Sequence, residues 1–239
     1  NKELAERGFR SSFVTAPPKG GNDFENIAAI KIADLLFVST RRRTPQKAMM
    51  DLIRQHLDAG KPLGAIRTAS HGFDAKPPDD RYAAWPNFDR DVLGGHYLNH
   101  YGNNLLPVLR IPATSAQHPI LSGVGVENFR SHHSLYRSRE LAGTATPLLT
   151  VTIAVDGKDV TEPVAWANTK ANRRVFYTSL GGPEDFKEPN FRRLLLNGVL
   201  WALNEKIPPP PAGAAPNKAN NQTGPLSQAD SLRRFQVAD

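Results

Sequence analysis

The sequence contains no cysteine and no long apolar run. Without cysteine in its 239 residues, the chain has no disulfide, no thiolate metal ligand and no cysteine nucleophile. This absence does not identify a compartment, because disulfide-free proteins occur on both sides of a membrane. No stretch approaches the roughly eighteen consecutive apolar residues of a membrane span. The length suits one large domain followed by a tail.

A concentrated basic surface is also missing. The chain has 30 Lys and Arg residues against 23 Asp and Glu residues, which gives a net charge of +7. These cations are scattered except for Arg41, Arg42 and Arg43, a short run typical of a solvated loop. Aromatic residues do not alternate with basic residues as they do in single-strand-binding proteins. We therefore expect no nucleic-acid partner, while a few cations in one cleft still allow an anionic ligand.

The first half of the chain alternates strand and helix patterns. Strands are predicted at residues 11–15, 35–39 and 62–66, and the second of these is a continuous apolar run typical of buried parallel strands. Helices are predicted between them at residues 22–32 and 44–60. This order predicts an α/β fold with a parallel sheet and right-handed crossovers.

The second half has a different pattern. Residues 71–104 form a long polar loop, which is uncommon in a compact domain unless it is functional, with a short helix at 87–93. A strand is predicted next, at residues 105–111. A hairpin turn at Asp156-Gly157 then indicates antiparallel strands. A last strand at 174–179 and an amphipathic helix at 189–203 follow.

The ends of the sequence suggest a piece of a larger protein. Residues 2–7 have the pattern of a helix end with Gly8 as its cap, so we expect a preceding strand to be missing and targeting signals to be unreadable. We predict one domain at residues 1–207, a Pro-rich and then flexible linker at 208–224, and the start of a further domain or a disordered tail at 225–239.

The strand at 62–66 leads into the most informative motif. It is followed at once by a turn of small residues that includes Thr68 and Ser70, and ligands of doubly wound sheets bind at the carboxyl ends of strands. A sharp turn of this kind resembles a nucleophile elbow, and the side chain that it presents is Arg67. Arg67 is not a nucleophile but is suited to bind carboxylate, phosphate or sugar hydroxyls. The alternative is an arginine paired with a structural carboxylate.

Histidines gather after this turn. His71 follows it directly, and His96 and His100 lie four residues apart, the spacing with which two imidazoles can ligate a metal from one helical face. Gly94-Gly95 disfavours a regular helix there. The three histidines are a candidate site for a divalent ion such as Zn²⁺, with one position left open. The alternative is three hydrogen-bonding residues without a metal.

A third candidate follows the last predicted strand. Glu184 and Asp185 come directly after Gly181-Gly182-Pro183. Glu184 could lie in the same cleft as Arg67, pairing with it or acting as an acid or base. The alternative is that both carboxylates only favour the N-terminus of the next helix.

Three segments together resemble the ThuA-like (trehalose utilisation) family over about residues 1–205. They are GKPLGAIRTASHGF, the stretch from Trp85 to His100, and RVFYTSLGGPEDFKEPNFRRLLLNGVLWAL. The resemblance implies a class I glutamine amidotransferase-like three-layer α/β sandwich with a mostly parallel central sheet. It also implies a role in carbohydrate metabolism of the trehalose or keto-sugar type.

The resemblance indicates what the site has lost. Arg67 stands where glutaminases carry the elbow cysteine, and Gly182-Pro183-Glu184 where they carry His-Pro-Glu, so nucleophile and base are absent. Many ThuA-like relatives have a histidine where this chain has Gly182. The implied site has Arg67, His71 and Glu184 in catalytic roles. Its substrate-binding residues would be Thr68, Ser70, Trp85, His96, Tyr97, His100 and Asp185, with Trp85 or Tyr97 as a sugar-stacking platform.

The tail GPLSQADSLRRFQVAD resembles the lead-in to a sorbosone-dehydrogenase-like propeller domain. This likeness implies an exported or periplasmic protein whose same polypeptide continues into an oxidoreductase-like domain. Two functions remain open. The domain binds or processes a sugar without glutaminase activity, or it is a non-catalytic module that positions the oxidoreductase.

Overall fold

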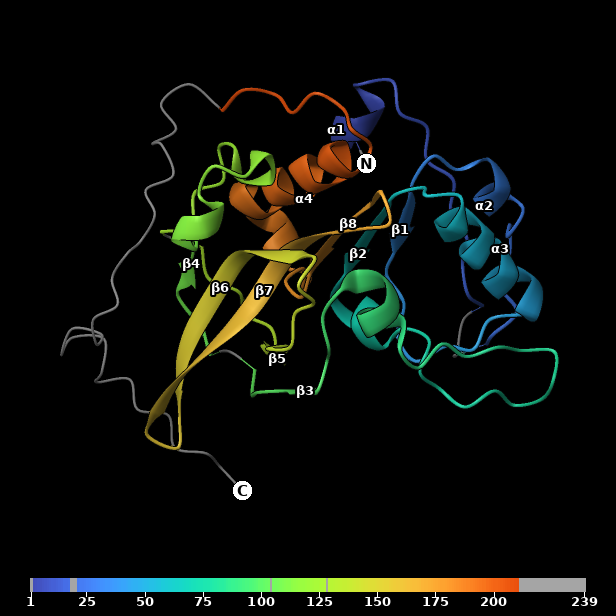
Figure 1. Ribbon diagram of the computed structural model, residues 1–239, viewed down its shortest axis with the longest axis horizontal. Helices are drawn as coiled ribbons and strands as arrows, with labels where there is room; N and C mark the ends of the chain where they lie inside the picture. The colour runs from blue at the N-terminus through green and yellow to red at the C-terminus, as the bar shows by residue number, and fades with distance from the viewer. Residues whose placement is uncertain (1, 18–20, 104, 128, 211–239) are drawn as a thin grey trace.

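The computed structural model describes residues 2–17, 21–103, 105–127 and 129–210 of the chain (Figure 1). Its main sheet has six strands in the order β1-β2-β8-β7-β6-β4. The strands are β1 (Leu36–Val38), β2 (Leu63–Ile66), β8 (Arg173–Thr178), β7 (Lys158–Lys170), β6 (Ala145–Val155) and β4 (Leu109–Arg110). β1, β2 and β8 pair in parallel, whereas the other neighbours are antiparallel. The predicted α/β fold is confirmed, with a mixed sheet whose parallel pairing is confined to three strands.

Helices and short turns surround this sheet. The helices are α1 (Lys2–Ala5), α2 (Ala29–Ile32), α3 (Lys47–Asp58) and α4 (Pro189–Ala202). A separate two-stranded ribbon is formed by β3 (Asn99–His100) and β5 (Tyr136–Arg137). Single helical turns lie at η2 (Arg67–His71), η3 (Asp89–Leu93), η4 (Ala113–Ser115), η5 (Pro119–Leu121) and η6 (Asp185–Lys187). In Figure 1, α4 lies above the sheet, while α2 and α3 lie together at its right.

The two faces of the sheet carry separate hydrophobic cores. Successive side chains of a strand point to opposite faces, so Phe176 of β8 joins the cluster that contains Phe191 and Leu194 of α4. Its neighbour Tyr177 joins the cluster that contains Met50 of α3. Helices therefore cover both faces, as the three-layer sandwich requires.

The helix α4 approaches the sheet closely because it carries a glycine. Gly198 is buried, and a Cβ atom placed on it would overlap the Phe176 ring of β8. The missing side chain lets this stretch of the helix lie directly against β8. The carboxyl ends of β2 and β8, where the predicted site residues begin, lie side by side through their parallel pairing, with Ile66 opposite Thr178.

The structure corrects several element boundaries. Residues 11–15 form no strand, only an isolated bridge between Thr15 and Glu25, because this edge has no longer partner within the described residues. The predicted helix at 22–32 is helical only in α2, and Asn26 has φ +59°, a left-handed conformation that interrupts it. The predicted helix at 87–93 is the π-helical turn η3, which ends at Gly94 with φ +80°.

The structure describes only part of the predicted C-terminal linker and tail. From residue 211 onward, the expected linker at 208–224 and the tail at 225–239 lie outside the described residues. Within residues 2–17, 21–103, 105–127 and 129–210, every helix is too short or too polar to cross a bilayer.

Candidate functional site

The turn after β2 holds Arg67 in an unusual backbone conformation. All four residues of β2 are buried, and the chain then turns sharply into η2. Arg67 has φ +50°, a left-handed conformation that costs a non-glycine residue of order 1 kcal/mol or more. Two donors hold the turn: the Tyr177 hydroxyl bonds to the Arg67 carbonyl at 2.7 Å and Ser70 Oγ bonds to it at 3.3 Å. The turn thus has the elbow shape that the sequence predicted.

The Arg67 guanidinium ties three chain segments together. Its Nη1 donates to the carbonyls of Ser134 at 3.1 Å and Ser179 at 2.9 Å, and Nη2 donates to Ser134 Oγ at 3.2 Å. The guanidinium also lies 4.8 Å from the centre of the Tyr136 ring. No carboxylate of the described residues forms a salt bridge with it, so the pairing with a structural carboxylate is not found there.

His71, the last residue of this turn, packs against two aromatic rings. It is 6% exposed, its ring stacks on Tyr97 at 4.1 Å, and the Tyr136 ring lies at 5.7 Å. Its Nδ1 is 3.2 Å from Ser70 Oγ. Burial, followed by the charges of Arg42, Arg41 and Arg67, lowers the pKa of His71 from 6.5 to about 4. His71 is therefore a neutral imidazole at pH 7, able both to donate and to accept a hydrogen bond.

This lowered pKa predicts a loss of stability in mild acid. Between pH 6.5 and pH 4, His71 binds a proton in the unfolded chain but not in the folded protein, so stability falls as the pH falls. The change from 6.5 to about 4 corresponds to about 3 kcal/mol. Denaturant unfolding should be measured at pH 7 and pH 4 for the wild type and for His71→Phe, whose ring stacks but does not titrate. The free energy of unfolding of the wild type should fall by about 3 kcal/mol more than that of the variant. Equal losses in the two proteins would contradict the assignment.

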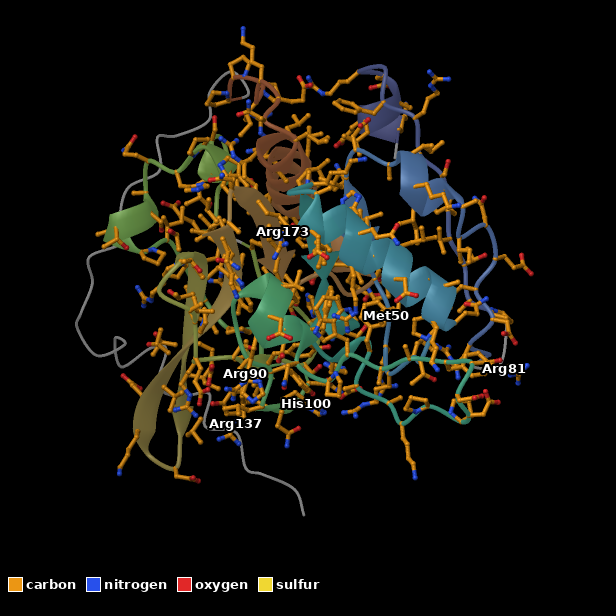
Figure 2. The ribbon with its side chains drawn as sticks, turned by 45° about the vertical axis from the view of Figure 1, so that its right-hand side comes forward. Met50, Arg81, Arg90, His100, Arg137 and Arg173 are labelled. Carbon is orange, nitrogen blue, oxygen red and sulfur yellow. The ribbon has the colours of Figure 1, made fainter. Side chains whose placement is uncertain are left out.

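The three histidines do not form the predicted zinc site. His96 Nδ1 lies 3.0 Å from Asp89 Oδ2, and His100 Nδ1 lies 2.9 Å from the Tyr101 carbonyl. Figure 2 shows His100 and Arg137 together at the lower edge of the molecule, where β3 pairs with β5. Across the residues that the structure describes, no three His, Asp or Glu side chains converge to hold a metal ion. Each imidazole is instead engaged by its own neighbour, because Gly94-Gly95 ends the helical turn before His96.

Trp85 lies apart from the stacked rings. Its Nε1 donates to Asp91 Oδ2 at 2.7 Å, and the Arg54 guanidinium of α3 lies 3.8 Å from its ring centre. Its other ring contact is an edge-to-face packing on Phe88. One face of the indole is therefore already covered by Arg54. Tyr97, rather than Trp85, is the aromatic ring that accompanies His71.

The turn after β8 places two carboxylates in different environments. Asp185 is 1% exposed, and its Oδ2 accepts from the backbone N–H groups of Gly181 at 2.6 Å and Gly182 at 3.0 Å and from Ser131 Oγ at 3.0 Å. Glu184 is half exposed and bonds His133 Nε2 at 2.8 Å through Oε2. Asp185 thus fixes the turn, while Glu184 pairs with His133 instead of Arg67.

The site brings some predicted residues together and adds others. Arg67, Thr68, Ser70 and His71 share η2, and Tyr97 stacks on His71. Trp85, His96 and His100 have separate partners. Sequence reasoning did not find the following contributors: His133, Ser134, Tyr136, Tyr177 and Ser179. The doubled His132-His133 in FRSHHSLY is the one signal that pointed to that segment.

Solved structures share this fold. A putative ThuA-like protein from Parabacteroides merdae superposes with a TM-score of 0.58 at 17% identity, covering 91% of this chain and 88% of that one. A putative ThuA-like protein from Bacteroides uniformis gives a TM-score of 0.54 at 18% identity, covering 74% and 71%. At such identities the likeness shows the fold alone. No curated protein matches the chain.

A family model resolves what the structures leave open. The model described as ThuA, trehalose utilisation, matches residues 4–202. That span includes the elbow at Arg67, the ring stack on His71 and the β8 turn at Glu184 and Asp185. The chain therefore belongs to the ThuA, or trehalose utilisation, family.

Proposed function

We propose that this ThuA-family domain binds a sugar or sugar derivative at the carboxyl edge of β2 and β8, without glutaminase activity. The observation that carries the proposal is the neutral imidazole of His71, stacked on Tyr97 and flanked by Tyr136, beside the guanidinium of Arg67. Apolar ring faces with a few fixed polar groups are the usual composition of a small-molecule site.

The chemistry of these groups suits a carbohydrate. His71 and Tyr136 are buried, whereas Tyr97 is partly exposed and presents an apolar ring face on which the C–H side of a sugar ring packs. The sugar hydroxyls need hydrogen-bond partners. Arg67 has five N–H donors, and three hydrogen bonds from it to Ser134 and Ser179 are formed, which leaves two for a ligand. The family description, trehalose utilisation, supports the same substrate class.

Glutaminase chemistry needs a thiolate at the elbow, and this sequence has no cysteine. Arg67 occupies that backbone position, and a guanidinium has no acceptor or nucleophilic lone pair with which to attack an amide carbon. The proposal therefore predicts no ammonia release from glutamine by the pure protein.

A thermal-shift screen with disaccharides and their 3-keto derivatives tests the proposal at millimolar ligand. We expect at least one sugar to raise the melting temperature, and Tyr97→Ala to weaken its binding about tenfold, the equivalent of about 1.4 kcal/mol. His100→Ala is the matched control, because that exposed side chain bonds only to Tyr101 among the described residues and should leave affinity within about twofold of wild type. If no sugar shifts the melting temperature, the proposal is wrong.

One observation favours a second function. Two of the three hydrogen bonds that the Arg67 guanidinium donates go to main-chain carbonyls, as in a purely structural arginine. In that case the domain is a non-catalytic module that positions an oxidoreductase domain of the same polypeptide. Sugar turnover by the isolated chain would exclude this alternative, and the absence of any sugar binding would favour it.

A further inference from the structure

His133 fills a space that a glycine leaves open. A Cβ atom placed on Gly182 would overlap the His133 imidazole. The backbone of Gly182 lies outside the left-handed region, unlike that of Gly181 with φ +110°, so conformation does not require glycine at 182. The requirement is steric: the position has no side chain because the imidazole of another segment lies there.

The imidazole is oriented by a carboxylate. Nε2 of His133 bonds Oε2 of Glu184 at 2.8 Å, and the two side chains are 27% and 51% exposed. The hydrogen bond from His133 lowers the pKa of Glu184, so the carboxylate is ionised at neutral pH. An ionised carboxylate accepts the Nε2 proton, which leaves Nδ1 as the basic nitrogen. No other described residue hydrogen-bonds to His133.

The chain segments that carry His133 and Glu184 also accept hydrogen bonds from Arg67. Ser134, the residue after His133, offers both its carbonyl and its hydroxyl to the guanidinium. Ser179, which precedes the turn that carries Glu184, offers its carbonyl to the same group. A base and a fixed cation are thus held by the same two chain segments at the edge of the sheet, and both are accessible in part to solvent.

We propose that His133, oriented by Glu184, removes and returns a proton at the carbon next to a carbonyl of a keto-sugar. The C–H bond breaks, the proton moves to Nδ1, and the electron pair moves onto the carbonyl oxygen, whose negative charge lies near Arg67. Return of the proton to carbon restores the ketone, so the step needs no oxidant and no second reactant. A base paired with an electrophilic group is the arrangement that such proton transfer requires. The inference rests on the proposed sugar site.

Exchange of that proton in D₂O measures the step directly. The full chain is incubated with a 3-keto-glucoside in D₂O, and the loss of the ¹H signal next to the carbonyl is followed by NMR, with the unoxidised glucoside as the ligand control. We expect the wild type to accelerate exchange, and His133→Ala to slow it by about 100-fold, the usual contribution of a general base. His132→Ala is the matched control, because this exposed neighbour should leave the rate unchanged.

Two further variants test the position of the imidazole. Gly182→Ala should slow exchange as His133→Ala does, because the new methyl group displaces the ring. Adding Gly182→His to His133→Ala returns an imidazole to the same space and should restore part of the rate. Glu184→Gln should slow exchange about tenfold and move the acid limb of the pH–rate profile to lower pH, an effect that a merely structural contact would not have.

The outcomes separate this inference from the proposed function. If the wild type binds the 3-keto-glucoside in the thermal-shift assay but exchange is absent, or is unchanged in His133→Ala, the base assignment is overturned and the sugar site stands. If the wild type shows neither binding nor exchange, both are overturned. Exchange that depends on His133, Gly182 and Glu184 but not on His132 supports the assignment.

Discussion

Replacing Asp185 with alanine is expected to lower the free energy of unfolding by about 3–4 kcal/mol. The buried carboxylate accepts hydrogen bonds from the Gly181 and Gly182 amides and from Ser131, and each donor left buried without a partner costs about 1–3 kcal/mol. The turn that presents Glu184 loses its anchor at the same time. Urea denaturation measures the stability, and the thermal-shift assay measures the remaining sugar affinity, which we expect to fall at least tenfold.

Asp185→Asn is the matched control for that variant. Its amide oxygen can still accept from both glycine amides, while its negative charge is lost, so we expect a loss of only about 1–2 kcal/mol. Ser131→Ala removes a single bond and should cost about 1 kcal/mol. An alanine variant as stable as the asparagine variant would show that the turn does not depend on this carboxylate.

The second large effect is expected at Glu162, a residue of β7. Its side chain is fully buried, and it accepts from the Ser138 amide at 2.8 Å, from the Tyr101 hydroxyl at 2.7 Å and from Arg139 Nε at 3.1 Å. Removing one partner of a buried charged network costs about 3–5 kcal/mol. We therefore expect Glu162→Ala to destabilise the protein by that amount in urea denaturation.

Glu162 also secures the segment that completes the site. The bond to Ser138 lies two residues beyond Tyr136, so Glu162→Ala should weaken sugar binding although Glu162 does not belong to the ring stack. Glu162→Gln retains the shape and one accepting oxygen and should cost about half as much. If Glu162→Ala binds sugar with wild-type affinity at a temperature where it is folded, the 131–139 segment does not depend on this network.

The sequence predicted those elements whose pattern is local. β1, α3, β2, the β6–β7 hairpin, β8 and α4 all lie where apolar periodicity and turn residues indicated them. The strand expected at 105–111 is reduced to β4, Leu109–Arg110. It pairs only with one edge of β6, and Leu106 has φ +47°, which interrupts an extended run.

The sequence indicated the position of candidate residues best where they follow a strand end directly. Arg67, His71, Glu184 and Asp185 were expected near one another because parallel strands bring their carboxyl ends to one edge, whereas Tyr97 entered through the family resemblance. His133, Ser134 and Tyr136 come from a segment that crosses this edge from elsewhere in the sequence, and no local pattern reveals such a contact. The space above Gly182 is likewise filled by a residue 49 positions away (133 against 182), which spacing alone does not indicate.

The central claim is that a sugar binds at the carboxyl edge of β2 and β8. Backbone amide chemical-shift mapping of the isotope-labelled full chain, titrated with the disaccharide or 3-keto derivative that gives the largest thermal shift, tests it most directly. We predict that the largest saturable changes fall on residues 67–71, 97, 133–136 and 179–184. Saturable changes confined to another surface, or no change at millimolar sugar, would contradict the claim.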